Sequence, residues 1–305
     1  MTDLSPKILL SGASGLIGAH VVRALNQNRI QTVQLIRKEK DSPNSGDIRW
    51  DAKAEPPVEN FRQLEGLEAA IHLSGANLSS HRWTESYKRE IVSSRVDTTL
   101  ALVRVFRALK QPPRALLCAS ATGIYGERGG QVLTEAADPG RGFLPETCVA
   151  WEAAADEAES LGMRVANLRF GVVITPEGGA LKQMLPLFRA GAGGTLGNGR
   201  QWMSWIALPD LIRAILYVLR TETLAGAVNM VAPSPVTNAN FTRALGQAVR
   251  RPTILPAPAF ALRLAFGEMA DEALLASTRA VPERLLKSGF HFELPDISPA
   301  LKAVL

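Results

Sequence analysis

The stretch "KILLSGASGLIGAH" (residues 7–20) joins a short apolar run to an apolar helical pattern through Gly12, Gly15 and Gly18. In this GxxGxxG pattern the first glycine permits a tight strand-to-helix turn, the second lets backbone approach a diphosphate, and the third lets the helix pack closely. The helix N-terminus offers unpaired N–H groups to phosphate. Because the pattern lies inside a strand-helix-strand unit, it predicts a dinucleotide site. The alternative is a glycine-rich turn that binds nothing. A P-loop is excluded, since no Gly-Lys-Ser/Thr follows.

Apolar strand patterns alternate with helical patterns along the rest of the chain. Strands are expected at 7–12, 31–37, 67–75, 113–121, 164–174 and 226–233, and helices at 16–30, 85–109, 147–162 and 209–222. This order predicts an α/β fold, a Rossmann-type doubly wound parallel sheet with a smaller, mostly helical C-terminal cap lobe. Residues 175–205 are glycine-rich and are predicted to be a loop. The predicted division is 1–175, completed by about 205–233, for the nucleotide-binding domain, and 176–204 with 234–305 for the cap lobe.

Composition excludes several classes of protein. The 305 residues are 46% hydrophobic, and no apolar run reaches the length of a membrane span. Two cysteines make no disulfide framework, and the four histidines lack metal-ligand spacing, so no metal site is predicted. The net charge of +5 comes from scattered basic residues, which does not favour nucleic acid. We expect a cytoplasmic monomer or homodimer whose partner is a small-molecule substrate, with no membrane or nucleic-acid partner.

The end of the second strand bears on which dinucleotide binds. This strand ends "QLIRKEK", so Arg37 and Lys38 precede the only nearby acid, Glu39. An acidic residue at this point bonds the ribose 2′-OH of NAD, whereas an arginine suits the 2′-phosphate of NADP. Arg37 therefore favours NADP over NAD. The alternative is a solvated basic strand end.

These motifs resemble the extended short-chain dehydrogenase/reductase superfamily, of the nucleotide-sugar epimerase type. "HLSGANL" (72–78) is similar to the motif beside the cofactor, "CASATGIYG" (118–126) to the serine segment, and 196–219 to the link toward the substrate cap. The tail at 276–301 resembles a C-terminal domain of unknown function in one atypical "epimerase family" branch. The resemblance implies cofactor contacts from the glycine turn and from the stretch beside it, namely Gly12, Ser14, Gly15, Leu16, Ile17, Gly18, Leu73, Ser74 and Gly75.

The resemblance also implies a catalytic set of Ser, Tyr-x-x-x-Lys and often Asn, most of which this chain lacks. Ser120 matches the serine, but Cys148 stands where the tyrosine would be and Glu152 where the lysine would be. Arg95 stands at the asparagine position. A tyrosine acid/base needs the neighbouring cation, because its ordinary pKa of about 10 keeps it protonated at neutral pH.

Other residues are candidates to compensate. Tyr125 follows the serine strand and could reach a substrate, or it could be an aromatic side chain packed beneath the cap. Arg95 could supply charge to a diphosphate or a substrate oxyanion. Glu90 could pair with Arg95 or touch the cofactor, and the alternative for both is a solvated helix face.

Two hypotheses follow. The first is an atypical NADP(H)-dependent oxidoreductase or epimerase acting on an unidentified small molecule such as a sugar nucleotide. Ser120 would orient the substrate, and Tyr125 or a water would move the proton. The second is a catalytically silent NADP-binding regulatory or scaffold protein. The retained Ser120 and the cap favour the first hypothesis, and the lost Tyr-Lys pair favours the second.

Overall fold

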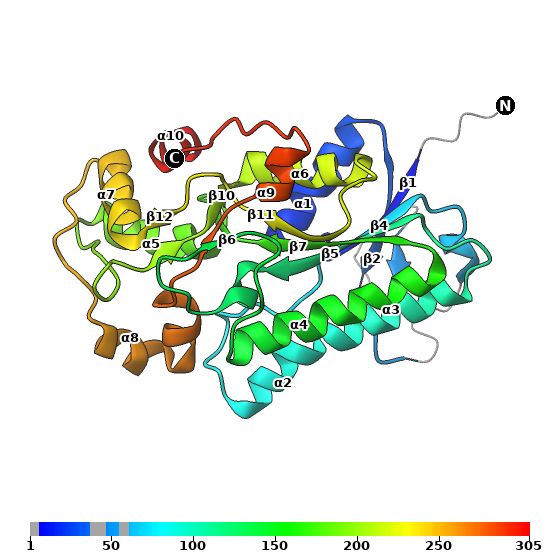
Figure 1. Ribbon diagram of the computed structural model, residues 1–305, viewed down its shortest axis with the longest axis horizontal. Coiled ribbons are helices and arrows are strands. Elements are labelled where there is room, and N and C mark those ends of the chain that lie inside the picture. Colours follow the sequence, from blue (N-terminus) through cyan, green and yellow to red (C-terminus); the bar gives the residue numbers. More distant parts are fainter. Residues whose placement is uncertain (1–5, 37–46, 55–60) are drawn as a thin grey trace.

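A seven-stranded parallel sheet organises the computed structural model, which describes residues 6–36, 47–54 and 61–305. The strand order is β11-β7-β5-β4-β1-β2-β3 (Figure 1). The bounds are β1 (Lys7–Ser11), β2 (Gln31–Ile36), β3 (Ile48–Arg49), β4 (Ala69–His72), β5 (Ala115–Ala121), β7 (Arg164–Phe170) and β11 (Gly226–Met230). The strand order reverses direction between β1 and β4, and in sheets of this kind ligands bind at the carboxyl ends of the strands beside such a point.

Helices cover both faces of the sheet because successive strand residues point to opposite sides. Ile8 and Leu10 of β1 join the apolar core under α1 (Leu16–Gln27) and α6 (Leu208–Arg220). Leu9 joins the core under α3 (Val96–Ala108) and α4 (Phe143–Asp156). In Figure 1, α1 and α6 run above the sheet, and α3 and α4 below it. The predicted doubly wound fold is confirmed.

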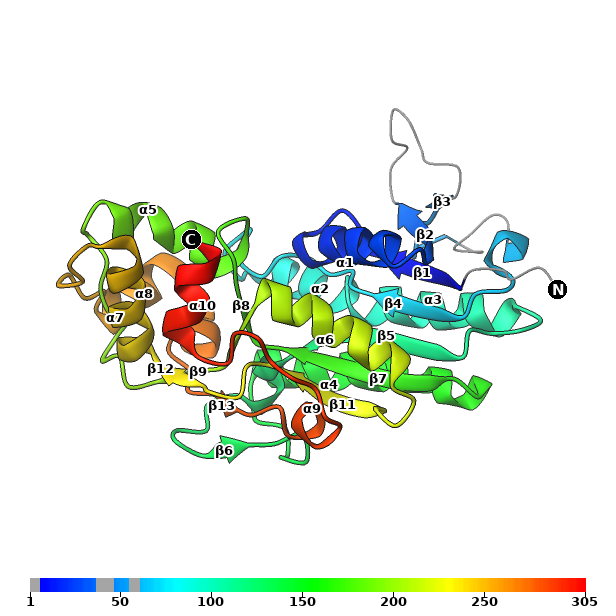
Figure 2. The same ribbon diagram turned by 90° about the horizontal axis from the view of Figure 1, so that it is seen from above.

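The C-terminal part forms a smaller, mostly helical lobe beyond the carboxyl ends of the strands (Figure 2). A core centred on Trp205 and Phe241 holds together three of its helices, at 179–189, 238–249 and 297–304. The helices of the lobe are α5 (Gly179–Arg189), α7 (Asn238–Val249), α8 (Ala259–Phe266) and α10 (Ile297–Val304), whereas Leu285 of α9 (Glu283–Lys287) packs in the core of the sheet domain. Short strands link the lobe to the sheet domain, namely β6 (Val132–Leu133), β8 (Val172–Ile174), β9 (Trp202–Met203), β10 (Trp205–Ala207), β12 (Val236–Thr237) and β13 (Arg279–Ala280). Within the described residues, no helix combines the length and the apolar character that crossing a bilayer would need.

Three elements differ from the sequence prediction. The glycine-rich stretch 175–205 is not all loop, since it contains α5 and two short strands. The helix expected at 147–162 begins earlier, at Phe143, and ends as a 3₁₀ turn at Glu157–Leu161. The single helix expected at 85–109 is broken into α2 (Glu85–Ser93) and α3.

The break between α2 and α3 has a local cause in side-chain bonds to the backbone. The guanidinium of Arg95 donates to the carbonyl of Ile91, which a continuous helix would have offered to the backbone N–H of Arg95. That N–H turns instead to the carbonyl of Val92, three residues back. The hydroxyl of Ser94 also donates to the carbonyl of Ile91. Such competition from polar side chains interrupts helices without any glycine or proline.

Candidate cofactor and catalytic site

The turn after β1 is tight, and its surroundings require glycine. Gly12 has φ +75°, and a Cβ on it would lie 2.7 Å from the backbone of Leu73. A Cβ on Gly18 would lie 2.1 Å from the carbonyl oxygen of Gly12. Gly15 is less constrained, since its Cβ would lie 3.3 Å from the same oxygen. The two crowded glycines therefore keep α1 close against the ends of β1 and β4.

The N-terminus of α1 is suited to an anion. Gly15 is its N-cap and has no side chain to bond the first N–H groups, and the first turn has no acidic residue. Ser14 is exposed at this end, and Leu16 and Ile17 begin the helix. Unpaired N–H groups and the partial positive charge of a helix N-terminus favour phosphate. The residues present therefore fit the diphosphate of a dinucleotide, although the individual contacts stay a prediction.

The end of β4 lies directly against this turn. The backbone N–H of Leu73 donates to the carbonyl of Ser11 at 3.1 Å, which brings the predicted stretch Leu73, Ser74 and Gly75 beside Gly12. Beneath it, the Ser11 hydroxyl lies 2.5 Å from Nδ1 of His72, and His72 is fully buried. Burial lowers the pKa of His72 to about 4, so its imidazole is neutral at physiological pH.

Arg95 lies between the end of β4 and α4. Its guanidinium donates to the carbonyls of Ile91 and Ala76, each at 3.0 Å, and lies over the ring of Trp151 at 5.2 Å. Burial lowers the pKa of this guanidinium. Glu90 is exposed, and among the described residues no ion pair joins it to Arg95. Arg95 is thus next to the predicted cofactor loop. Its guanidinium carbon lies 3.4 Å from the position that a Cβ on Gly75 would take.

A buried polar chain begins at Ser120, near the carboxyl end of β5. The Ser120 hydroxyl donates to Oε1 of Glu152 at 2.6 Å. Arg169 of β7 grips the same carboxylate with two bonds, from Nε to Oε1 and from Nη2 to Oε2, each at 2.8 Å. The side chains of Arg169 and Glu152 are 8% and 11% exposed, so the ion pair is almost completely buried from solvent. Burial opposes the charge on Arg169, but the bonds and charge of Glu152 raise its pKa above the ordinary value.

Tyr125 belongs to the same chain of contacts. Its hydroxyl donates to Oδ1 of Asn229 at 2.7 Å and accepts from Nη1 of Arg169 at 3.0 Å. The residue has 0% exposure, as the packed-aromatic alternative expects. Burial raises the pKa of the hydroxyl, with Arg169 acting in the opposite direction. Arg169 therefore links Tyr125 to Glu152, the residue to which Ser120 donates its hydrogen bond.

Cys148 is buried one turn before Glu152 on α4. Burial, reinforced by the charge of Glu152, raises the pKa of its thiol to about 12. The thiolate is the reactive form of cysteine, so this side chain is not poised as a nucleophile at neutral pH.

The sequence prediction missed Arg169 and Asn229 as members of this network. One signal was available, since Arg169 stands between Leu168 and Phe170 near the end of a strand that was predicted to be buried. A buried charge in a central strand needs a partner of opposite charge. Arg37, which favoured NADP, lies outside the described residues. Within the part of the chain that is described, no three His, Cys, Asp or Glu side chains gather as a metal site.

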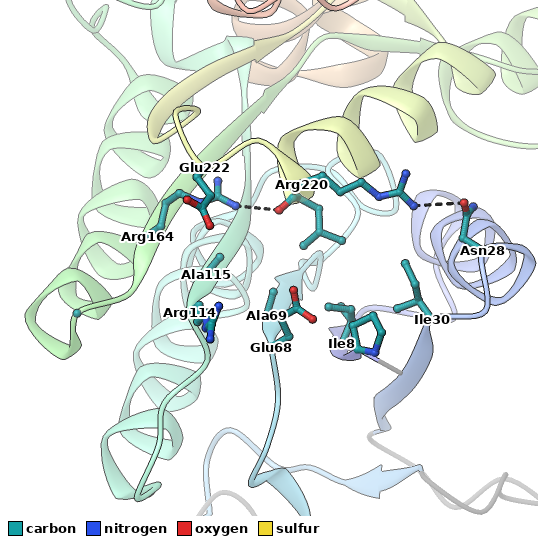
Figure 3. Close-up of a pocket in the computed structure, with 13 residues that line it drawn as sticks. Ile8, Asn28, Ile30, Glu68, Ala69, Arg114, Ala115, Arg164, Arg220 and Glu222 are labelled. Carbon is teal, nitrogen blue, oxygen red and sulfur yellow. Dashed lines mark hydrogen bonds between the residues drawn. The ribbon is translucent and has the colours of Figure 1, made fainter. Parts of the chain in front are cut away.

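A cavity of about 700 Å³ lies at the opposite edge of the sheet, away from the glycine turn (Figure 3). Ile8, Ala69 and Ala115 line it, at the amino ends of β1, β4 and β5. Two of the arginines that line it bind protein oxygens, Arg164 the carbonyl of Leu219 and Arg220 the side chain of Asn28. Because ligands of such sheets bind at the carboxyl ends of the strands, we do not assign this cavity to the cofactor.

Comparisons with known proteins agree with this geometry. Residues 8–230 match the NAD dependent epimerase/dehydratase family, and residues 257–304 match a domain of unknown function, DUF1731. The chain is 40% identical over 296 residues to epimerase family protein Mb2239 of Mycobacterium bovis, covering 96% of each chain. It is 33% identical over 301 residues to epimerase family protein YfhF of Bacillus subtilis, covering 98% of this chain and 97% of that protein.

Two solved structures are similar over nearly all of this chain. Human epimerase family protein SDR39U1 (isoform 2), solved with NADPH, has 30% identity and a TM-score of 0.88, covering 98% of each chain. A nucleoside-diphosphate sugar epimerase of Corynebacterium glutamicum has 31% identity and a TM-score of 0.79. That likeness covers 99% of this chain and 58% of that protein.

Proposed function

Because this chain belongs to the NAD dependent epimerase/dehydratase family, we propose that it is an NADP(H)-dependent, atypical oxidoreductase or epimerase acting on a small molecule such as a sugar nucleotide. The preference for NADP is supported by Arg37 and by the NADPH of the human relative. The observation that carries an enzymatic role is the bond between Ser120 and Glu152 at the carboxyl edge of the sheet.

The nicotinamide, when bound, supplies or accepts a hydride at the reacting carbon. The protein must then move one proton at the substrate oxygen. In the resting state Ser120 donates a hydrogen bond to the Glu152 carboxylate. The lone pairs of the Ser120 oxygen therefore remain free to accept a hydrogen bond from a substrate hydroxyl. As the substrate O–H bond breaks, its proton goes to the Ser120 oxygen, and the Ser120 proton goes to Glu152. Reduction of a carbonyl runs the same two transfers backwards.

Arg169 and Tyr125 position the Ser120–Glu152 pair without contacting the substrate. Arg169 orients the Glu152 carboxylate with its two bonds, and Tyr125 and Asn229 orient Arg169. Tyr125 was the sequence candidate for the proton step. Its full burial supports a positioning role instead, with the proton assigned to Ser120 and Glu152.

A catalytically silent NADP-binding protein is the second candidate function. The observation that favours it is Arg169, which bonds to both oxygens of Glu152 and leaves fewer lone pairs of that carboxylate free to receive a proton. The cytoplasmic location and the monomeric or homodimeric state remain predictions from the sequence.

Binding and turnover should be tested separately. Calorimetry of NADPH, NADP⁺ and NADH with the wild type tests the cofactor, and Arg37→Ala should weaken NADPH much more than NADH. Turnover is followed by the nicotinamide absorbance with a panel of sugar nucleotides, ketones and aldehydes. Ser120→Ala and Glu152→Gln should abolish any turnover while NADPH still binds. Tight NADPH binding without turnover across the panel would instead support the silent candidate, and equal NADPH affinity in Arg37→Ala would remove the 2′-phosphate contact.

A further inference from the structure

The helix that carries Glu152 lacks a cap of its own. α4 follows Gly142, whose φ of +118° excludes most side chains and which has no side chain to bond the first N–H groups of the helix. Glu272, from the C-terminal lobe, fills this role, because its Oε2 accepts the backbone N–H of Leu144 at 3.1 Å. A Cβ on Gly142 would lie 2.3 Å from the Glu272 carboxylate, so glycine leaves the space that this carboxylate occupies.

The same segment of the C-terminal lobe fastens the loop that follows Tyr125. The Thr278 hydroxyl donates to the carbonyl of Gly126 at 3.1 Å, and the Ser277 N–H donates to Glu127 at 2.6 Å. A few residues on, β13 pairs in parallel with β6. The loop is therefore bound to the lobe on several sides.

This loop in turn contacts the buried pair. Oε1 of Glu135 accepts the backbone N–H of Arg284 at 3.2 Å, while the carbonyl of Glu135 accepts from Nη1 of Arg169 at 3.3 Å. Arg169 then grips Glu152. Two routes thus run from the segment 272–284 to Glu152, one through the N-terminus of α4 and one through Arg169.

We propose that the C-terminal domain of unknown function positions the candidate site, with Glu272 as the cap of α4 and residues 277–284 as the anchor of the loop 126–135. Glu272 is a positioning residue, since it acts on Glu152 through α4 rather than on a substrate. This role goes beyond the proposed function, because it holds for an enzyme and for a silent cofactor-binding protein alike. It predicts that a substitution of Glu272 in the C-terminal lobe changes the stability of the first turn of α4, which belongs to the sheet domain.

Glu272→Ala removes the cap, and its neighbour offers a matched control. Asp271 is exposed and pairs with Arg263 of α8 at 3.0 Å, so Asp271→Ala removes a carboxylate from the same turn without touching α4. Glu272→Gln keeps an oxygen that can accept the Leu144 N–H. Two readouts on the full-length protein report on α4. Hydrogen exchange follows its first turn, and fluorine NMR of 5-fluorotryptophan protein follows Trp151, whose signal is assigned by its loss in Trp151→Phe.

We expect Glu272→Ala to speed exchange in the first turn of α4 by about fivefold, which is the usual effect of losing a helix cap. The Trp151 signal should shift or broaden. Glu272→Gln should stay close to the wild type, and Asp271→Ala should leave both readouts unchanged. The proposal is overturned if Glu272→Ala leaves α4 and Trp151 as in the wild type, if Asp271→Ala has the same effect, or if Glu272→Gln behaves like the alanine variant.

A second variant keeps the test decisive if Glu272→Ala does not fold. Thr278→Val removes one hydroxyl at nearly constant volume, and with it the bond to the carbonyl of Gly126. Exchange in the loop 126–135 should rise in this variant, and unchanged exchange there would refute the anchoring role. NADPH calorimetry on the wild type is independent of these variants, so failure of the proposed function and failure of the positioning role give different results.

Discussion

His72 should make the protein sensitive to acid, in a pH window that the structure defines. The imidazole is fully buried, with Nδ1 accepting from the Ser11 hydroxyl and Nε2 facing Thr98 at 3.5 Å. The Thr98 hydroxyl donates its hydrogen bond to the carbonyl of Ser94 at 2.7 Å. Thr98 can therefore only accept from Nε2–H, and the neutral ring has a partner on each nitrogen. A second ring proton would have to be added at Nδ1, inside the buried contact with Ser11.

The sign and size of the effect follow from the pKa difference. Burial lowers the pKa of His72 from 6.5 to about 4. As the pH falls below 6.5, the unfolded chain binds a proton that the folded chain does not, so stability falls until the pH reaches about 4. One pKa unit is worth 1.36 kcal/mol, so this histidine should cost about 3 kcal/mol of unfolding free energy across the window.

Urea unfolding at a series of pH values between 6.5 and 4, followed by tryptophan fluorescence, measures this loss. His72→Gln should be less stable than the wild type at neutral pH, because a buried hydrogen-bonded ring is lost. Its stability should nevertheless fall less steeply with acid, by about 3 kcal/mol over the window. His20→Gln is the control, since His20 on α1 is only partly buried and pairs with Glu177. If His72→Gln and the wild type lose stability in parallel, the buried neutral histidine is not the cause.

Three further predictions test other parts of the site. Arg169→Met should lower the unfolding free energy by about 3–5 kcal/mol in urea titrations, because Glu152 would stay buried without its cation. An increase in stability would show that the pair is dispensable. Gly18→Ala should lower both the melting temperature and the NADPH affinity measured by calorimetry, and it should lower the melting temperature more than Gly15→Ala, since its Cβ would meet backbone at 2.1 Å rather than 3.3 Å. Equal effects would contradict the close packing. The thiol of Cys148, with its pKa raised to about 12, should react with a thiol reagent only after unfolding, which mass spectrometry of the labelled peptide can follow.

Much of the fold was predictable because its determinants are local. The glycine turn, the buried strands and the amphipathic helices each depend on residues close together in sequence. The break at Arg95 was not predictable from breaker residues, because it comes from a side chain competing for the Ile91 carbonyl. The helix at 179–189 was hidden by the glycines that surround it.

The candidate site was predictable only where it reduces to a motif. Ser120 and Glu152 could be matched to positions of the family motif. Their hydrogen bond could not be predicted in that way, because it joins residues 32 apart in the chain. Arg169 meets Glu152 because β7 and α4 are neighbours in space, which no periodicity reveals. The cap from Glu272 lies further still, 128 residues beyond Leu144.

That separation has a consequence for synthesis. A ribosome makes the chain from the N-terminus, so β1, α1 and the nucleotide turn are available long before Glu272 has been added. α4 lacks its cap, and the loop around Arg169 lacks its anchoring contacts, until residues 272–284 have been added. A nascent chain halted before residue 272 should hold its glycine turn in place while the first turn of α4 still lacks its cap. Residues 272–284 therefore complete the placement of α4 and of the loop around Arg169 only after the glycine turn has been made.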